Sequence, residues 1–211
     1  MQGKAKPIVE DAGEPQPSAA DGRRRELARH AAEQFDAVGY HQTTVADIGE
    51  AMGLSKASVY HYFSSKDEIL FWIHEDFVDE LITRHEARFR TPMPAAQSLL
   101  ELIGDMLDVV ENSRSEVRVF FEHFRELTPE QQAPIRVKRA RYQTFVEDVI
   151  RRGIETGELR DLDPRLTTLA LFGMCNWAYQ WFSPDGPLRS RQLAYFFWDL
   201  FLRGASRNAG S

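Results

Sequence analysis

Apolar side chains recur at every third or fourth position from about residue 23 to residue 203, and no segment shows the strict alternation of a half-buried strand. Glycine and proline divide this pattern into about nine segments. One such segment carries a continuous apolar stripe formed by Ala96, Leu99, Leu100, Ile103, Met106, Leu107 and Val110. The spacing therefore predicts an all-α fold with about nine helices.

The organisation along the chain predicts two helical domains. Residues 1–22 are rich in proline, glycine, glutamate and alanine, which predicts a disordered tail. We expect a three-helix domain over residues 23–68 and a larger helical domain over residues 69–211. No apolar run is long enough to span a bilayer, and the first residues lack the apolar core of a signal peptide. The lone Cys175 excludes an internal disulfide, so we expect a soluble cytoplasmic protein that binds no membrane.

Two short helices joined by a glycine turn are predicted between residues 43 and 66. Thr44 is placed to cap the first helix, Gly53 to end it, and Ser55 to cap the second, which runs to about Phe63. The second helix exposes hydrogen-bonding side chains: Lys56, Ser58, Tyr60, His61 and Tyr62. Such a surface is poorly suited to burial but suits phosphates and base edges, so the pattern predicts a helix-turn-helix that binds DNA. Tyr60 or Tyr62 taken alone would more often be a half-buried packing residue.

Charge restricts the kind of DNA binding that is possible. The formal net charge of −6 argues against a surface that binds nucleic acid over its whole extent. Residues 54–66, however, contain two lysines and no acidic residue. The charge pattern therefore predicts a small, local footprint on DNA.

Residues 24–70 resemble the DNA-binding domain of the tetracycline-repressor (TetR) family. The resemblance rests on the pattern T-T-x-x-x-I-x-x-x-x-G-x-S-x-x-x-x-Y-x-x-F-x-x-K, which begins at Thr43 and ends at Lys66. It implies phosphate contacts from Thr43, Thr44, Tyr60 and Lys66. It implies base or phosphate contacts from Lys56, Ser58, His61 and Tyr62. Ser55 is also counted among the DNA-binding residues. Gly49 stands where the family usually has alanine, and we expect it to loosen the first helix by up to about 1 kcal/mol.

An enzyme is the first alternative to a regulator. The sequence contains neither the Glu-x-x-His pairs of di-iron bundles nor a His-Glu-x-x-His zinc motif. His123 beside Glu122 could form an acid–base pair, although a ligand-facing or internally bonded histidine is favoured. Cys175 has no cation nearby to stabilise a thiolate. We therefore expect no enzyme activity, no cofactor and no metal site.

The last two predicted helices, about residues 164–182 and 188–203, indicate a homodimer. Residues 169–182 are apolar nearly all round, so this helix must be buried on both sides, and an exposed face of this kind is rarely tolerated. The expected interface residues are Trp181, Phe182, Leu193, Phe197, Leu200 and Phe201. The family resemblance implies a four-helix dimer bundle on a palindromic operator; a purely internal core is the alternative.

The middle helices carry more aromatic volume than a small core needs, which predicts an effector cavity. Plain packing of these side chains is an equal alternative. A structural or partner-binding bundle without a ligand is the second alternative function. The expected lining is Met106, Phe120, Phe121, Phe124, Tyr142, Phe145 and Trp177. A basic cluster could hold phosphates at its mouth: Arg136, Lys138, Arg139 and Arg141.

A second resemblance points to the class of effector. The pattern Trp177-x-x-x-Trp181-Phe182-x-Pro184-x-Gly186-Pro187-Leu188 resembles a branch of the family that responds to acyl-CoA thioesters in lipid breakdown. We therefore expect a repressor released by a hydrophobic effector of the acyl-CoA type. The alternative is an efflux-type regulator that senses a drug-like aromatic or cationic compound, and Glu122 and Glu126 in the cavity lining would favour it.

Overall fold

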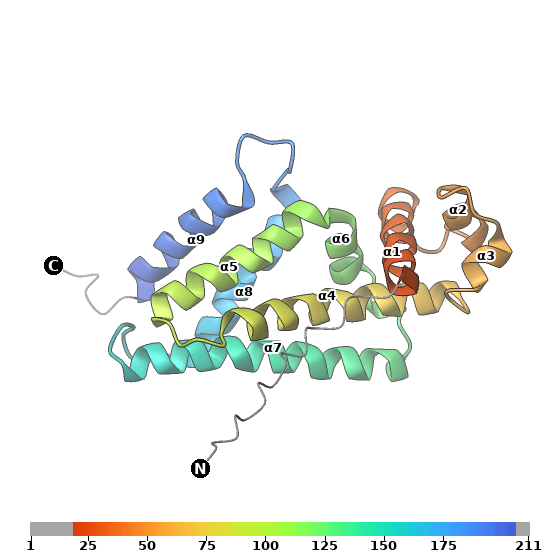
Figure 1. Cartoon of the computed structure of the whole chain (residues 1–211). Coiled ribbons are helices and arrows are strands. Elements are labelled where there is room, and N and C mark those ends of the chain that lie inside the picture. Colours follow the sequence, from red (N-terminus) through yellow and green to blue (C-terminus); the bar gives the residue numbers. More distant parts are fainter. Residues whose placement is uncertain (1–18, 206–211) are drawn as a thin grey trace, which may run out of the picture.

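The computed structural model describes residues 19–205, and over that range it confirms an all-α fold with nine α-helices and one 3-10 turn (Figure 1). The elements are α1 (Ala19–Val38), α2 (Val45–Glu50), α3 (Lys56–Tyr60), α4 (Lys66–Arg88), α5 (Ala95–Asn112), α6 (Arg114–Glu122), η1 (Phe124–Glu126), α7 (Pro129–Glu155), α8 (Pro164–Trp181) and α9 (Ser190–Ala205). Within these described residues, no helix is both long and apolar enough to cross a membrane.

The first helix begins earlier than the sequence predicts. Residues 19–22 belong to α1 and not to a disordered tail, and residues 1–18 lie outside the described range. Asp21 stands in the first turn, where a carboxylate interacts favourably with the positive end of the helix dipole. The alanine pair before it also has high helix propensity, so this start needs no large apolar residue.

Helices α1–α3 and the start of α4 share one small core at one end of the molecule (Figure 1). Its largest fully buried side chains are Leu27, Phe35, Ile48, Phe63 and Ile69. Arg24 of α1 pairs with Glu68 of α4 at 2.7 Å and lies 4.6 Å above the Phe63 ring. The start of α4 is therefore fixed to the first three helices by both packing and charge.

The larger region is built around α5, which contacts α4, α6, α7, α8 and α9. The long α7 begins at Pro129, where Thr128 and Gln131 form a reciprocal capping box. Helix α6 contacts both α1 and α4, and it links the two ends of the molecule. A movement of α6 would therefore displace its contacts with α1 and α4.

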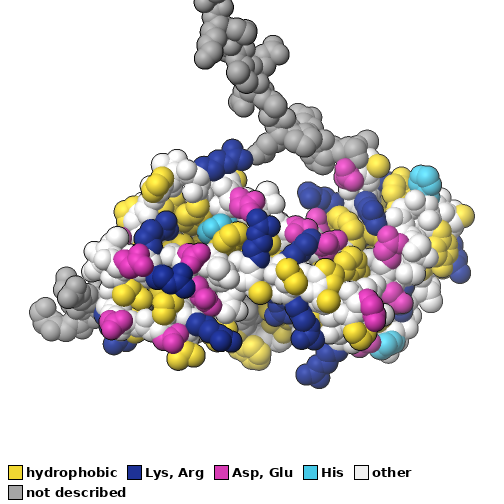
Figure 2. Space-filling model, turned by 90° about the horizontal axis from the view of Figure 1, so that it is seen from below, with side chains coloured by type: hydrophobic (Ala, Val, Ile, Leu, Met, Phe, Trp, Pro, Cys, Tyr) yellow, Lys and Arg dark blue, Asp and Glu magenta, His cyan; other side chains and the backbone are white. Residues whose placement is uncertain are grey.

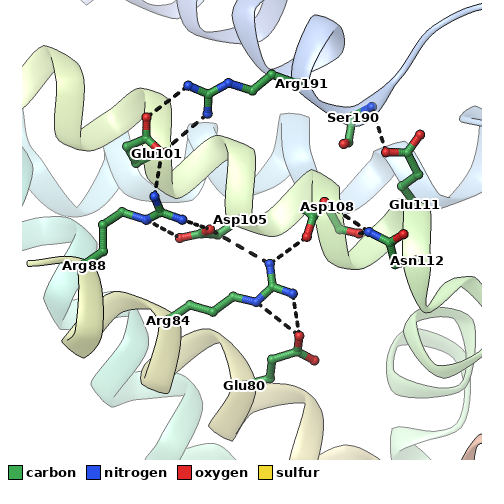
Figure 3. A network of polar contacts seen from close by, with 10 residues as sticks. All are labelled: Glu80, Arg84, Arg88, Glu101, Asp105, Asp108, Glu111, Asn112, Ser190 and Arg191. Atoms are coloured by element: carbon green, nitrogen blue, oxygen red, sulfur yellow. Dashed lines mark hydrogen bonds and ion pairs between the residues drawn. The ribbon is translucent and has the colours of Figure 1, made fainter.

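A network of charged side chains holds α4, α5 and α9 together (Figure 3). Arg88 of α4 donates two hydrogen bonds to Asp105 of α5, at 2.7 and 3.2 Å, and a third to Glu101 at 2.8 Å. Arg191 of α9 also contacts Glu101, at 3.0 Å. Asp105 is buried, and burial raises the pKa of its carboxyl group while Arg88 opposes that rise. Because a buried carboxylate must keep its partners, this network fixes the register of the three helices.

Candidate nucleic-acid interface and effector cavity

The helix-turn-helix is held by side-chain caps at the start of each helix. Thr44 accepts a hydrogen bond from the backbone N–H of Asp47, whose carboxylate accepts one in return from the backbone N–H of Thr44 at 2.7 Å. Ser55 caps α3 in the same way, through the backbone N–H of Ser58 at 3.1 Å. Between the helices Gly53 has a φ of +65°, a conformation that favours glycine. The predicted caps and turn are confirmed.

One face of this unit presents polar side chains to solvent. Of the residues predicted to contact DNA, the exposed ones are Thr44, Ser55, Lys56, Tyr60 and His61, and the partly buried ones are Ser58, Tyr62 and Lys66. Helix α3 ends at Tyr60, earlier than expected, so His61 and Tyr62 lie in the turn that follows it. The Lys56 ammonium lies 5.8 Å from the centre of the Tyr60 ring, and both side chains share the outer surface of α3.

Thr43 does not fit the phosphate contact that the resemblance implies. Its side chain is buried, and its hydroxyl donates to the carbonyl of Gly39 at 2.9 Å, which also accepts from the backbone N–H of Thr43 at 3.2 Å. Lys66 is also used internally: its Nζ donates to the carbonyls of Tyr40 (2.7 Å) and Thr43 (3.0 Å). The main contacts of both side chains are therefore with the turn that positions α2.

Tyr40 is a residue of this region that the sequence analysis missed. Its ring is buried, packs edge-on against Phe35 at 5.0 Å between ring centres, and lies under the Lys66 ammonium at 4.3 Å. Its hydroxyl donates to Asp67, and burial, reinforced by that carboxylate, raises its pKa. The sequence does carry a signal for Tyr40, because an aromatic residue directly follows Gly39, the glycine at the end of the first helix.

A cavity of about 310 Å³ lies between α4, α6, α7 and α8, with Met106 of α5 in its lining. It is lined by Val78, Leu81, Met106, Phe120, Phe121, Arg139, Tyr142, Gln143, Leu169, Phe172, Gly173 and Asn176. A smaller space of about 20 Å³ shares four of these residues and extends the cavity toward Cys175. The volume is at the lower end of the range for ligand sites. Four predicted residues, Met106, Phe120, Phe121 and Tyr142, are brought together here.

Three predicted residues are not in this lining. Phe145 stacks on His85, with 4.4 Å between ring centres, and Phe124 packs against His74. Trp177 is 62% exposed and was wrongly expected to face the interior. Trp177 lies on the face of α8 opposite to its buried residues, which are Thr168, Leu171, Cys175, Ala178 and Tyr179.

The polar groups of the cavity are few. Arg139 is the charged residue of the lining, and its guanidinium lies 5.1 Å from the centre of the Phe120 ring. The buried Tyr142 hydroxyl has no hydrogen-bond partner among the described residues, and burial raises its pKa, so it stays a protonated donor. Glu122 and Glu126, which would favour a cationic ligand, do not line the cavity; they contact Arg118 and His41.

A larger cavity of about 450 Å³ lies between α1, α4, α5 and α6. Its lining is mostly charged and includes Arg25, Glu26, Arg29, Asp76, Asp79, Glu80, Arg84 and Glu116. Several of these charges neutralise one another, as Arg25 and Asp76 do at 3.3 Å. A hydrophobic molecule would desolvate these charges, so the smaller cavity is the better site for it.

Large apolar side chains of α8 and α9 are exposed at the surface of the chain. Those at least 45% exposed are Leu166, Leu169, Trp177, Trp181, Tyr195, Phe196 and Leu200. Of the predicted interface residues, Trp181 and Leu200 are on this face. Phe182, Leu193 and Phe197 are instead buried within the protomer, and Phe201 is partly buried, because these side chains pack onto the protomer's own core.

No group of three or more His, Cys, Asp or Glu residues is placed to hold a metal ion in the described part of the chain. Cys175 is buried, and burial raises the pKa of its thiol to about 12. A thiol of this kind stays protonated and belongs to the core.

Comparison with known proteins identifies the family. Residues 27–72 match the family model described as bacterial regulatory proteins, tetR family, and residues 92–205 match the tetracyclin repressor-like C-terminal domain. The HTH-type transcriptional repressor KstR2 of Mycolicibacterium smegmatis is 26% identical over 196 residues, which is 92% of this chain and 96% of that protein.

Solved structures agree with this assignment. The TetR family regulator PfmR of Thermus thermophilus has a TM-score of 0.79 and 32% identity, covering 86% of this chain and 99% of PfmR. AibR, solved in complex with isovaleryl coenzyme A and operator DNA, has a TM-score of 0.75 and 27% identity, covering 84% of this chain and 97% of AibR. The chain belongs to the TetR family of DNA-binding transcriptional regulators.

Proposed function

We propose that the protein is a ligand-responsive repressor that binds a palindromic operator as a homodimer and is released by a hydrophobic effector of the acyl-CoA type. The observation that carries the DNA-binding part is the outer face of α3. It holds Lys56 and Tyr60 exposed, while Val59 on the opposite side is fully buried. Such a helix can enter the major groove without loss of its own packing.

Homodimer formation is supported by the uncovered apolar face of α8 and α9. A single helix-turn-helix reads only a few base pairs, so two copies about 34–36 Å apart are needed to read successive major grooves. Trp177 and Trp181 lie one helical turn apart on α8, and both are at least half exposed. A second copy of this face would bury them.

The cavity supports a hydrophobic effector. Its lining is mainly aromatic and aliphatic, and its charged residue is the basic Arg139, which favours an anionic over a cationic ligand. AibR, a related protein, was solved with an acyl-CoA thioester. Filling the cavity would press on Phe120 and Phe121 of α6, and α6 contacts α1, so ligand binding can change the spacing of the two recognition helices.

Operator binding is tested by fluorescence anisotropy on a site selected from random DNA. We expect Tyr60→Phe to weaken binding about fivefold, the value of one hydrogen bond, and Lys56→Gln to weaken it and lower the salt dependence. Arg151→Gln is the matched control, because Arg151 is an exposed basic residue near the C-terminal end of α7, outside the helix-turn-helix. Equal affinity for all four proteins would contradict the assignment.

The effector is tested by calorimetry with palmitoyl-CoA, palmitate and a cationic dye, followed by release of labelled operator. We expect the thioester to bind and to release DNA. Binding and release by the dye alone would contradict the acyl-CoA proposal and favour a regulator of the efflux type.

A further inference from the structure

Helix α7 carries four basic residues near its start, and they divide into two pairs. Lys138 contacts Glu75 at 2.7 Å and Asp79 at 2.6 Å, and Arg141 pairs with Glu86. These two charges are neutralised by α4. The first pair therefore serves the packing of α7 against α4.

The second pair, Arg136 and Arg139, has no carboxylate partner among the described residues. Arg136 donates to the neutral side chain of Gln132, and both guanidiniums lie over the Phe124 ring, at 5.5 and 5.4 Å from its centre. Arg139 also lies 5.1 Å from the centre of the Phe120 ring, which lines the cavity. Two cationic side chains therefore meet beside the cavity on an aromatic surface.

Both side chains reach the surface, so an anion can approach them. Partial desolvation lowers the pKa of Arg139, and the neighbouring charge of Arg136 lowers it further. Guanidinium groups bind carboxylates and phosphates through paired N–H donors, and desolvation strengthens such contacts. Figure 2 looks onto the α7 side of the molecule, where basic and acidic side chains are interspersed.

We propose that Arg136 and Arg139 form an anion-binding site at the mouth of the cavity, which holds the negatively charged head of an amphipathic effector while its apolar body lies against Phe120 and Phe172. The phosphates of a coenzyme A thioester and the carboxylate of a free acid share this chemistry. The inference builds on the proposed effector cavity, and it assigns the orientation of the ligand, with its head at α7 and its body toward α8.

The test uses two fluorescent probes of similar shape, so it does not depend on the natural effector. Anilinonaphthalene sulfonate is anionic, and N-phenylnaphthylamine is neutral. We expect Arg139→Gln and Arg136→Gln each to weaken the anionic probe by about tenfold and to leave the neutral probe within about twofold. Arg141→Gln is the matched control, because its charge is already paired with Glu86.

Circular dichroism confirms that each variant is folded before binding is measured. Unchanged sulfonate affinity in both arginine variants would overturn the site. So would an equal loss for both probes, since that would indicate collapse of the cavity and not loss of an anion contact.

Competition against the bound sulfonate then distinguishes the two natural head groups. Displacement by free coenzyme A assigns the site to phosphates, and displacement by palmitate but not by coenzyme A assigns it to a carboxylate. If no acyl compound binds while the arginine variants still discriminate between the probes, the proposed effector is wrong and the anion site stands. If palmitoyl-CoA releases DNA equally from wild type and both variants, the anion site is wrong and the proposed function stands.

Discussion

The two ends of the molecule differ in how much apolar surface they leave exposed to solvent. In α2 and α3 the apolar residues Val45, Ile48 and Val59 are buried, and the side chains left outside are mostly polar or small. In α8 and α9 the protomer buries Phe182 and Leu193 but leaves many equally large side chains exposed. Because extended apolar surface is rarely left in water, the C-terminal end is where we expect a second copy to bind.

This difference predicts that substitutions of adjacent residues have different consequences at the C-terminal end. Trp181 is half exposed, and its neighbour Phe182 is 2% exposed. Under the proposed dimer, a charge at the first position would face the second copy, and a charge at the second would face the chain's own core. The two residues thus separate association from folding.

The largest effect is expected from that pair. Trp181→Glu should leave the protomer folded but abolish the dimer, and operator affinity should fall by about a hundredfold or more, because an unpaired charge is placed in an apolar interface. Phe182→Glu should instead destabilise the protomer by about 4 kcal/mol or more, since it buries the charge in the core. Light scattering measures the first effect and thermal melting the second.

Two results would contradict the contrast between these residues. One is a stable dimer of the Trp181→Glu protein, which would place the interface elsewhere. The other is equal loss of folding in both variants, which would mean that Trp181 packs within its own protomer.

The next effect concerns His74 of α4, where the two ends of the molecule meet. Its ring is fully buried beside Phe120 and Phe124, and Nδ1 donates to the Leu70 carbonyl at 2.9 Å. Burial is the main cause that lowers its pKa from 6.5 to about 4. The folded state therefore keeps the ring neutral, so this contribution to stability is complete above pH 6.5 and is lost as the pH falls toward 4.

We expect this loss to amount to about 3 kcal/mol of unfolding free energy. His74→Leu removes the titration, so its stability should fall less steeply between pH 6.5 and 4 than that of the wild type. Urea unfolding at a series of pH values measures both slopes. Parallel slopes would show that carboxylates elsewhere cause the acid sensitivity.

The sequence predicts the N-terminal site better than the C-terminal one. Thr44, Gly53 and Ser55 each have one structural role at their spacing, so the caps, the turn and the outer face of α3 follow directly. Helix α8 is apolar on most sides, and periodicity cannot tell which face meets the core. That is why Trp177 was placed in the cavity while Phe172, which does line it, was missed.

Lys66 provides a smaller effect that tests the boundary between structure and DNA contact. Lys66→Met removes the Nζ donors to the carbonyls of Tyr40 and Thr43, so we expect a loss of about 2 kcal/mol in stability and a weaker operator affinity as a consequence. Lys56→Met is the matched variant: Lys56 is exposed on α3, so affinity should fall with stability unchanged. Melting curves and anisotropy are compared for both. Full stability with lost affinity in Lys66→Met would indicate that Lys66 contacts a DNA phosphate.

The smallest effect concerns Gly49, where the family pattern favours alanine. Helix propensity alone predicts that Gly49→Ala stabilises α2 by up to about 1 kcal/mol. The structure argues for the opposite sign. A Cβ at this position would lie 2.8 Å from the Leu54 carbonyl oxygen and 3.1 Å from Cγ2 of Val59, and the Leu54 N–H is itself bonded to the Gly49 carbonyl at 2.8 Å. The turn between the two helices is closed by that bond, so it cannot move away without loss of the contact.

We therefore expect Gly49→Ala to cost about 1 kcal/mol, the penalty of a mildly overpacked site, and to weaken operator binding by shifting α3 against α2. Gly22→Ala is the matched control, because Gly22 is also helical but a Cβ there meets nothing within 4 Å. That change should stabilise the protein by up to about 1 kcal/mol. Opposite signs for the two variants in chemical unfolding would show that the glycine keeps the two helices in close contact. A gain in stability from both would mean that the turn relaxes freely, and that Gly49 is merely a weak helix former.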